Sequence, residues 1–220
     1  AAVLFGPPRA NRKPVLRLFA DDGSTWGYTK LGVNDLTDAL VLSEATALDE
    51  VWRHAWSTVE PTRVVGRGSW HGRHYLTTAA LALAGSTRQP DQLPVAPTRE
   101  VFGQGADVRP LSAWELPEVA HPRLDDLRRR LLALAGETPV PTGAAHGDWT
   151  PWNMAWRGSP DGPDGVLEVW DWERFALNVP QGLDLVHFEA SRVRVDDNLR
   201  EAEPRLLAEL PLRLHDVGLD

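Results

Sequence analysis

Short apolar runs separated by turn-forming residues open the chain and predict an antiparallel sheet. Residues 14–19 read Pro-Val-Leu-Arg-Leu-Phe and residues 25–30 read Thr-Trp-Gly-Tyr-Thr-Lys, and both runs are typical of strands. The Asp-Asp-Gly-Ser sequence at 21–24 favours a turn between them. Lys30 therefore ends the second or third strand of a meander.

A helical pattern follows this meander. It runs from Asn34 to about Trp56, with Asn34 or Asp35 as the N-cap. The apolar positions at mainly helical spacing are Leu36, Leu40, Leu48, Val51 and Trp52. We therefore expect one helix directly after the strand that carries Lys30.

A second helical pattern runs from Pro122 to about Ala135 and ends at Gly136. Its apolar positions are Leu124, Leu127, Leu131, Leu132 and Leu134. Residues 84–122, which come before it, are rich in Gly, Pro, Gln and Thr and show weak periodicity. This stretch predicts loops with at most a short helix.

Two apolar runs in the second half of the chain predict a hairpin. Residues 154–157 and 166–170 are rich in Val, Leu, Met and Trp, and the Gly-Ser-Pro-Asp-Gly-Pro-Asp-Gly sequence between them is dense in turn formers. The outer ends of this hairpin bring Asn153 and Asp171 together, as a shared divalent cation would require.

Residues 146–153, His-Gly-Asp-Trp-Thr-Pro-Trp-Asn, carry the most informative chemistry of the chain. Phosphoryl transfer needs a carboxylate beside the attacking hydroxyl and an oxygen ligand for the metal on the nucleotide phosphates. One short loop can hold both groups. Asp148 and Asn153 fit these two roles, so we interpret this segment as a catalytic loop.

The order His-Gly-Asp, four residues, Asn, and then a hairpin ending in Asp-Trp-Glu resembles the aminoglycoside phosphotransferase and choline kinase superfamily. Its members are protein-kinase-like small-molecule kinases, and the resemblance covers most of the chain. It implies that Asp148 orients or deprotonates the substrate hydroxyl and that Asn153 and Asp171 bind Mg²⁺. Glu173 matches a further acidic residue that the family often carries two positions later.

The resemblance also implies an α+β, protein-kinase-like two-lobed fold. Residues 1–82 would form the N-lobe, with an antiparallel sheet, and residues 83–220 the mainly helical C-lobe. The run Gly-Arg-His-Tyr-Leu-Thr-Thr-Ala-Ala-Leu resembles the strand that leads into the hinge, so an adenine contact is expected near Leu81. By the same resemblance, Asp184 braces the catalytic loop and His146 supports it structurally.

Lysine usage points to a phosphate-binding residue. Only two lysines occur, and 21 of the 23 basic residues are arginine, so Lys30 on its predicted strand is a noticeable choice. A compact ammonium suits phosphate as a point charge. By resemblance, a helix glutamate pairs with this lysine. Glu44 is the favoured candidate because its neighbours are small, and Glu50 competes with it.

The segment expected to cover the phosphates departs from the family pattern. Residues 4–12, Leu-Phe-Gly-Pro-Pro-Arg-Ala-Asn-Arg, contain one glycine and no Gly-x-Gly-x-x-Gly pattern, and the chain has no Walker A sequence. Arg9 and Arg12 could reach phosphate, although a solvated hairpin tip is the favoured interpretation of both.

Composition excludes several classes of function. A net charge of −8 argues against a nucleic-acid backbone as substrate. No apolar run approaches the ~18 residues that a membrane helix needs. The absence of cysteine excludes disulfides and thiolate metal sites. Four histidines lack metal-ligand spacing, namely His71, His74, His121 and His187.

The leading hypothesis is a cytoplasmic, Mg²⁺-dependent kinase that transfers the γ-phosphate of ATP or GTP to a hydroxyl of a small molecule. An acidic cluster could attract an amine-bearing acceptor such as an aminoglycoside, although a solvated helix surface is its favoured interpretation. The cluster consists of Asp196, Asp197, Glu201 and Glu203.

Two alternatives stay open at this point. One is a nucleotide-binding pseudokinase that acts as an interaction module, and the other is nucleotidyl transfer on the same fold. Compared with members of this family, the chain has few residues after Glu173. Either the acceptor is small or loosely held, or the natural chain is longer.

Overall fold

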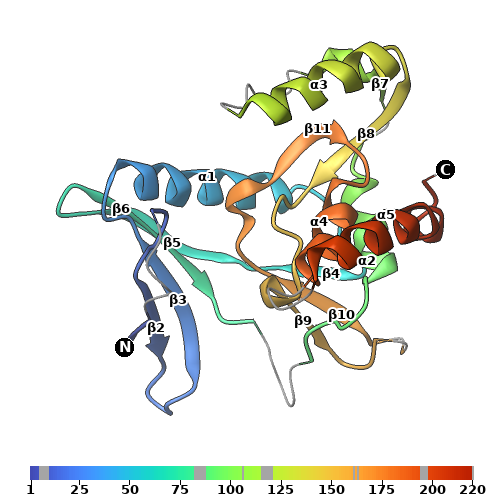
Figure 1. Cartoon of the computed structure of the whole chain (residues 1–220). Coiled ribbons are helices and arrows are strands. Elements are labelled where there is room, and N and C mark those ends of the chain that lie inside the picture. The colour runs from blue at the N-terminus through green and yellow to red at the C-terminus, as the bar shows by residue number, and fades with distance from the viewer. Residues whose placement is uncertain are drawn as a thin grey trace.

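An antiparallel sheet opens the chain, and the second half combines helices with two small three-stranded sheets (Figure 1). The computed structural model describes residues 1–4, 10–81, 88–105, 107–114, 121–160, 162, 164–193 and 198–219. No helix within these ranges is long and apolar enough to span a membrane.

The N-terminal sheet has five antiparallel strands in the order β1-β2-β3-β6-β5. They are β1 (Ala2–Leu4), β2 (Val15–Phe19), β3 (Thr25–Leu31), β6 (Arg73–Ala79) and β5 (Val64–Trp70). The two strands predicted around the turn at 21–24 are thus confirmed as neighbours. Lys30 lies in β3, opposite Val15 of β2 and Leu76 of β6.

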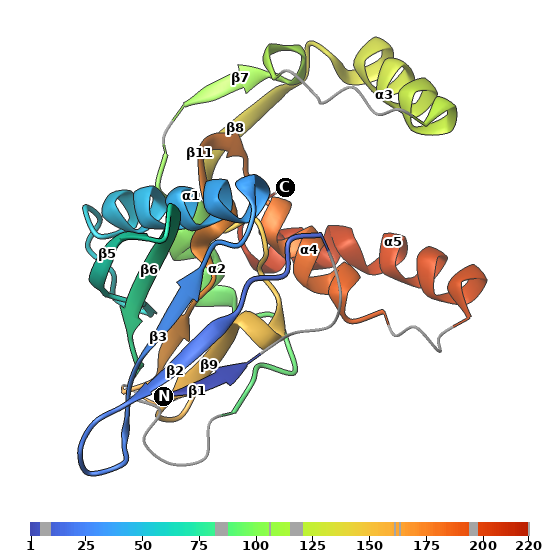
Figure 2. The same cartoon turned by 90° about the vertical axis from the view of Figure 1, so that its left-hand side faces the viewer.

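Helix α1 (Asp35–Val51) packs against β3, β5 and β6 (Figure 2). Asn34 caps it, since its side chain accepts a hydrogen bond from the backbone N–H of Thr37 at 2.9 Å while the Thr37 hydroxyl accepts one from the Asn34 N–H. The prediction that this helix continues to about Trp56 is wrong. The Val51 carbonyl accepts hydrogen bonds from the His54 backbone N–H at 3.2 Å and from the Trp56 indole N–H at 2.8 Å, so the chain leaves helical geometry in a tight turn.

A second sheet joins distant parts of the chain in the order β4-β10-β9. Its strands are β4 (Val59–Pro61), β10 (Val166–Val169) and β9 (Met154–Arg157). β9 and β10 form the predicted hairpin, in which Met154 pairs with Val169. β4 precedes the predicted boundary at residue 82, yet it runs parallel to β10. The two halves of the chain therefore share this sheet.

The third sheet leads into the loop at residues 146–153 that is predicted to be catalytic. Its order is β11-β8-β7, from β11 (Ala176–Pro180), β8 (Pro139–Ala145) and β7 (Val108–Pro110). Before β8 come α2 (Val95–Phe102), the 3-10 turn η1 (Leu111–Ala113) and α3 (Pro122–Ala135). A short helix was expected between residues 84 and 122, whereas β7 was not. The predicted helix ending before Gly136 is confirmed as α3, which lies on an arm with β7 (Figure 2).

The core surrounds the catalytic loop. Helices α4 (Leu183–Ser191) and α5 (Leu199–Asp216) complete the fold, and 3-10 turns η2 (Pro151–Asn153) and η3 (Trp172–Arg174) flank the hairpin. Trp149, Trp172 and Phe188 are fully buried and belong to one apolar cluster with Leu48 of α1 and Val169 of β10. Because these residues come from the loop, the hairpin, α1 and α4, packing fixes the loop relative to all three elements.

Candidate active site

Asp184 of α4 holds the loop that follows β8. Its Oδ2 accepts a hydrogen bond from the His146 backbone N–H at 2.7 Å, and its Oδ1 accepts one from the Gly147 N–H at 2.9 Å. Gly147 has a φ of +80°, and a Cβ there would lie 2.5 Å from the carbonyl oxygen of Arg174. Only glycine fits this bend, and Asp184 braces it.

His146 is fully buried beneath the loop. Its Nδ1 accepts a hydrogen bond from the Asp148 backbone N–H at 3.2 Å, so the ring proton lies on Nε2, which donates to the Trp170 carbonyl at 3.0 Å. The ring also packs edge-on against Trp172. Burial lowers the pKa of His146 and keeps the ring neutral. The side chain therefore ties the loop to the hairpin.

This burial makes the stability of the fold depend on pH. Below the ordinary histidine pKa of 6.5, the unfolded chain takes up a proton on His146 that the folded chain excludes. Lowering the pH from about 7.5 to about 5.5 should therefore reduce the free energy of unfolding by about 1 kcal/mol through this residue. Urea titrations of wild type and His146→Gln at both pH values measure the effect. Equal pH dependence in the two proteins would contradict it.

Asp148 lies just beyond this support, with its side chain 29% exposed. Its Oδ2 accepts a hydrogen bond from Asn153 Nδ2 at 2.9 Å, which leaves Oδ1 to meet a hydroxyl. His187 of α4 approaches this second oxygen, with Nε2 at 3.6 Å. Sequence spacing does not indicate His187, because its approach to Asp148 depends on how α4 packs.

Asp171 occupies a left-handed backbone position at the end of the hairpin, with a φ of +69° and a ψ of +52°. Such a conformation is uncommon for a residue other than glycine and is found at functional sites. The Asn153 carbonyl accepts a hydrogen bond from the Trp170 N–H at 3.1 Å, so the hairpin brings the two predicted ligands close together. Lys30 Nζ lies 2.6 Å from Asp171 Oδ1. Burial opposes ionisation of Asp171, but the charge of Lys30 outweighs the effect of burial and lowers the pKa of Asp171 to about 2.

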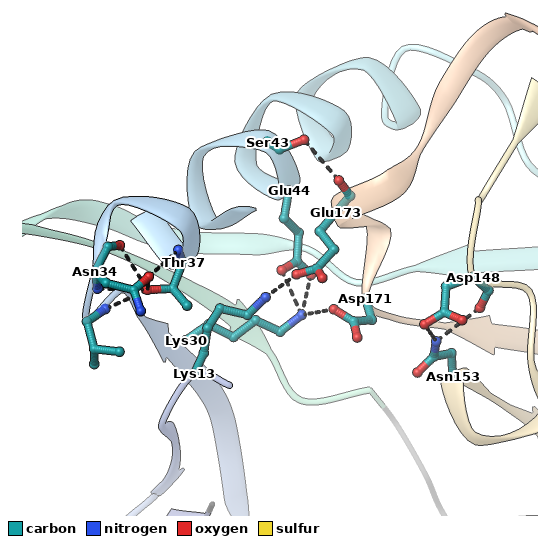
Figure 3. A network of polar contacts seen from close by, with 11 residues as sticks. Lys13, Lys30, Asn34, Thr37, Ser43, Glu44, Asp148, Asn153, Asp171 and Glu173 are labelled. Atoms are coloured by element: carbon teal, nitrogen blue, oxygen red, sulfur yellow. Dashed lines mark hydrogen bonds and ion pairs between the residues drawn. The ribbon is translucent and has the colours of Figure 1, made fainter. Parts of the chain in front are cut away.

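Lys30 also contacts both carboxylate oxygens of Glu44, at 2.6 Å each (Figure 3). Glu44 is 1% exposed. Burial alone would lower the pKa of Lys30, but the charges of Glu44 and Asp171 raise it above its usual value, so the ammonium stays protonated. Glu50, the competing candidate, lies on α1 and instead pairs with Arg53 in the turn that follows this helix.

Glu173 has a partner that sequence reasoning missed. The ammonium of Lys13, the other lysine of the chain, donates to Glu173 Oε2, and the Ser43 hydroxyl donates to the Glu173 carbonyl at 2.9 Å. Figure 3 shows both lysine side chains pointing toward the same group of carboxylates. The available signal was lysine usage: an arginine-rich chain keeps two lysines, and both reach this cluster.

A cavity of 420 Å³ opens beside these groups. Leu81, expected near the adenine, lines it together with Lys30 and Asp171. The other lining residues are Leu4, Val15, Tyr28, Glu44, Thr62, Thr78, Ala79, Asn153 and Trp170. The predicted lysine, its glutamate, the hinge residue and two predicted metal ligands thus border one space that has both apolar and charged walls.

Some candidate residues do not reach this space. Arg9 lies outside the described residues, and Arg12 is exposed and does not line the cavity. Asp196 and Asp197 of the acidic cluster also lie outside the described ranges. The remaining members of that cluster, Glu201 and Glu203, are exposed on α5.

The fold matches solved aminoglycoside phosphotransferases over nearly the whole chain. APH(3'')-Id from Streptomyces rimosus, in complex with ADP and streptomycin, is 15% identical with a TM-score of 0.54, covering 98% of this chain and 86% of that chain. A second APH(3'')-Id structure has a TM-score of 0.58 at 17% identity and the same coverage. The GDP and kanamycin complex of APH(2")-IIia has a TM-score of 0.51 at 11% identity, covering 99% and 77%. This chain has the kinase-like fold of the aminoglycoside phosphotransferases.

No family model and no curated protein matches the sequence. The predicted α+β, protein-kinase-like fold is nevertheless confirmed, because the structural similarity covers 98% of this chain with TM-scores of 0.54 and 0.58 although few residues are identical.

Oxygen ligands gather at one point of this aminoglycoside phosphotransferase fold. The carboxylates of Glu44, Asp171 and Glu173 offer oxygen atoms that all lie within 4.8 Å of one another. Asn153 donates from its side-chain Nδ2 to Asp148, and it lines the same cavity as Glu44 and Asp171. Hard oxygen donors of this kind fit Mg²⁺. The residues present are therefore compatible with the predicted cation.

Proposed function

We propose that this protein is a phosphotransferase that moves the γ-phosphate of ATP or GTP to a hydroxyl of a small molecule. One observation carries the proposal. The Asp148–Asn153 pair, Asp171 and the Lys30–Glu44 pair, which come from four separate segments, meet beside one cavity. Phosphoryl transfer depends mainly on positioning and on charge stabilisation, and this set of side chains supplies both.

The nucleotide would bind in the 420 Å³ cavity. Its base would lie against the apolar wall, with Leu81 at the hinge, and its phosphates would approach the Lys30 ammonium. Glu44 keeps that ammonium fixed and Asp171 adds a second anchor. The similar structures contain ADP and GDP, which supports a purine nucleotide as the donor.

Asn153, Asp171 and Glu173 would hold Mg²⁺, which when bound neutralises charge on the β- and γ-phosphates. The αL backbone of Asp171 aims its carboxylate from the hairpin end toward the cavity that it lines. Asn153 would serve two purposes, because its Nδ2 donates to Asp148 Oδ2 while its Oδ1 would ligate the cation. The catalytic loop and the ligand set are thereby linked by a direct hydrogen bond.

Asp148 would receive the acceptor hydroxyl at Oδ1, the oxygen that Asn153 leaves available. As the hydroxyl oxygen forms its bond to the γ-phosphorus, the bond between that phosphorus and the bridging oxygen breaks and the nucleoside diphosphate leaves. The hydroxyl proton passes to Asp148. His187, 3.6 Å from the same oxygen, adds a polar group on the acceptor side.

The acceptor is proposed to be an amine-bearing compound such as an aminoglycoside. The net charge of −8 favours a cationic partner and disfavours nucleic acid. The similar APH(3'')-Id structure contains streptomycin, and the APH(2")-IIia structure contains kanamycin. Use of a nucleoside triphosphate would suit a reaction in the cytoplasm. Division into an N-lobe at 1–82 and a C-lobe at 83–220 suits a nucleotide bound at the hinge.

Product mass tests this proposal. The protein is incubated with Mg²⁺, ATP or GTP, and a panel of aminoglycosides, amino alcohols and sugars. Addition of one phosphate to a panel member, with release of the diphosphate, is the expected result. Addition of a nucleotide would instead indicate nucleotidyl transfer. Binding of nucleotide with no product from any acceptor would favour a pseudokinase.

A further inference from the structure

We propose that Lys13 is a second phosphate-binding residue, which exchanges Glu173 for the phosphates of a nucleoside triphosphate when a divalent cation takes Glu173. The inference rests on the proposed function and adds to it a residue outside the catalytic loop and the hairpin. It also assigns a phosphate contact to Lys13, which directly follows the segment 4–12 that is expected from the sequence to cover the phosphates.

The first support is the burial of the pair. The Lys13 side chain is 8% exposed and that of Glu173 is 7% exposed, although the two residues are separated by 160 positions. Removing a lysine and a glutamate from water costs free energy that their mutual attraction only partly offsets. A pair of apolar side chains would stabilise the fold as well. The charges are therefore better explained by a ligand than by stability.

The second support is the position of Lys13 beside the cavity. Leu4 ends β1 and pairs with Val15, which begins β2, and both side chains line the cavity. Lys13 lies on the connection between these strands, just before Val15. Its ammonium contacts Glu173, whose carboxylate lies next to those of Glu44 and Asp171 that Lys30 contacts, as Figure 3 shows. A small movement of a flexible side chain would carry it from Glu173 to a phosphate in that cavity.

Charge supplies the reason for the exchange. Three carboxylates, from Glu44, Asp171 and Glu173, face the ammonium groups of Lys13 and Lys30. A divalent cation that ligates Glu173 would meet the Lys13 ammonium at contact distance, where like charges repel strongly. Lys30 is retained by Glu44 through two contacts. Lys13 forms one ion pair among its described contacts, with Glu173, and otherwise acts on Asp171 through its charge, so it is the cation that moves.

Residue choice agrees with this exchange. Arginine fills 21 of the 23 basic positions, and its planar fork favours fixed two-point contacts. Lysine presents a compact charge on a flexible stem, which suits transfer between a carboxylate and a phosphate. Both lysines of the chain reach the same cluster.

Two binding measurements on the whole protein test the exchange. Mn²⁺ alone is titrated while its free signal is followed by electron paramagnetic resonance, and MgATP is titrated by calorimetry. For Lys13→Met we expect Mn²⁺ to bind about tenfold tighter, because no ammonium competes for Glu173, and MgATP about tenfold weaker, because a phosphate contact is lost.

Arg17→Met is the matched control, because it removes one positive charge as Lys13→Met does. Arg17 is exposed on β2 and contacts the Thr25 hydroxyl. This substitution should change neither affinity. A Lys13→Met, Glu173→Gln double variant leaves no unpaired buried charge and should still bind MgATP weakly without the gain in Mn²⁺ affinity. Unchanged MgATP affinity in Lys13→Met overturns the inference, while MgATP binding by wild type preserves the proposed function. Absence of MgATP binding by wild type overturns both.

Discussion

Asp148→Asn should lower the turnover number for phosphoryl transfer about a thousandfold while leaving MgATP affinity within about twofold. The substitution removes the group that orients the acceptor hydroxyl and takes its proton. It preserves shape, and the asparagine side-chain oxygen can still accept the hydrogen bond from Asn153 Nδ2. Steady-state rates of phosphorylated product and calorimetric titration of MgATP measure the two quantities.

A carboxylate elsewhere provides the control for this experiment. Asp126 lies on α3, where its side chain is 55% exposed, and Asp126→Asn should leave both turnover and affinity unchanged. If Asp148→Asn retained wild-type turnover, Asp148 would not be the catalytic carboxylate. If it lost MgATP affinity as well as turnover, the loop itself would have been disturbed.

Among the substitutions considered, Lys30→Met should lower the free energy of unfolding most, and it should also reduce turnover. Glu44 is 1% exposed, and removal of its lysine partner leaves a buried carboxylate uncompensated, which costs about 3 to 5 kcal/mol of unfolding free energy. Turnover should also fall about a hundredfold or more, because an ammonium that stabilises transferring charge is gone. Urea unfolding and product formation report the two losses.

An exposed ion pair that also joins a strand of the N-terminal sheet to α1 offers a matched comparison with the buried Lys30–Glu44 pair. Arg67 of β5 contacts Asp49 of α1 at 2.6 Å, but both side chains are about half exposed. Arg67→Met should therefore cost no more than about 1 kcal/mol and leave turnover intact. A double variant, Lys30→Met with Glu44→Met, should recover part of the lost stability and none of the activity. Equal stability of Lys30→Met and wild type would show that the buried pair does not support the fold.

The parts of the site that sequence predicts well are local. His146, Asp148 and Asn153 belong to one octapeptide, and Asp171 follows at the far end of a hairpin whose turn residues are evident. Because the two strands of a hairpin pair, Asn153 and Asp171 can be predicted to lie close together without knowing the rest of the fold. The helix cap at Asn34 is equally local, because its partner is Thr37.

The parts that sequence does not predict depend on distant packing. Lys13 meets Glu173 across 160 positions, and β4 joins β10 in a parallel pair that no turn signals. His187 approaches Asp148 because α4 is anchored by Asp184. The early end of α1 follows from an indole hydrogen bond, since helical periodicity alone allows Trp56 to continue the helix.

Titration of ATP and GTP with and without Mg²⁺ tests whether these residues form a nucleotide and metal site. The proteins are wild type and an Asp171→Asn, Asn153→Ala double variant, in which asparagine tolerates the left-handed backbone of position 171. We expect Mg²⁺-dependent nucleotide binding by wild type that the variant loses. Absence of nucleotide binding by wild type, or equal Mg²⁺ dependence in the variant, would contradict it.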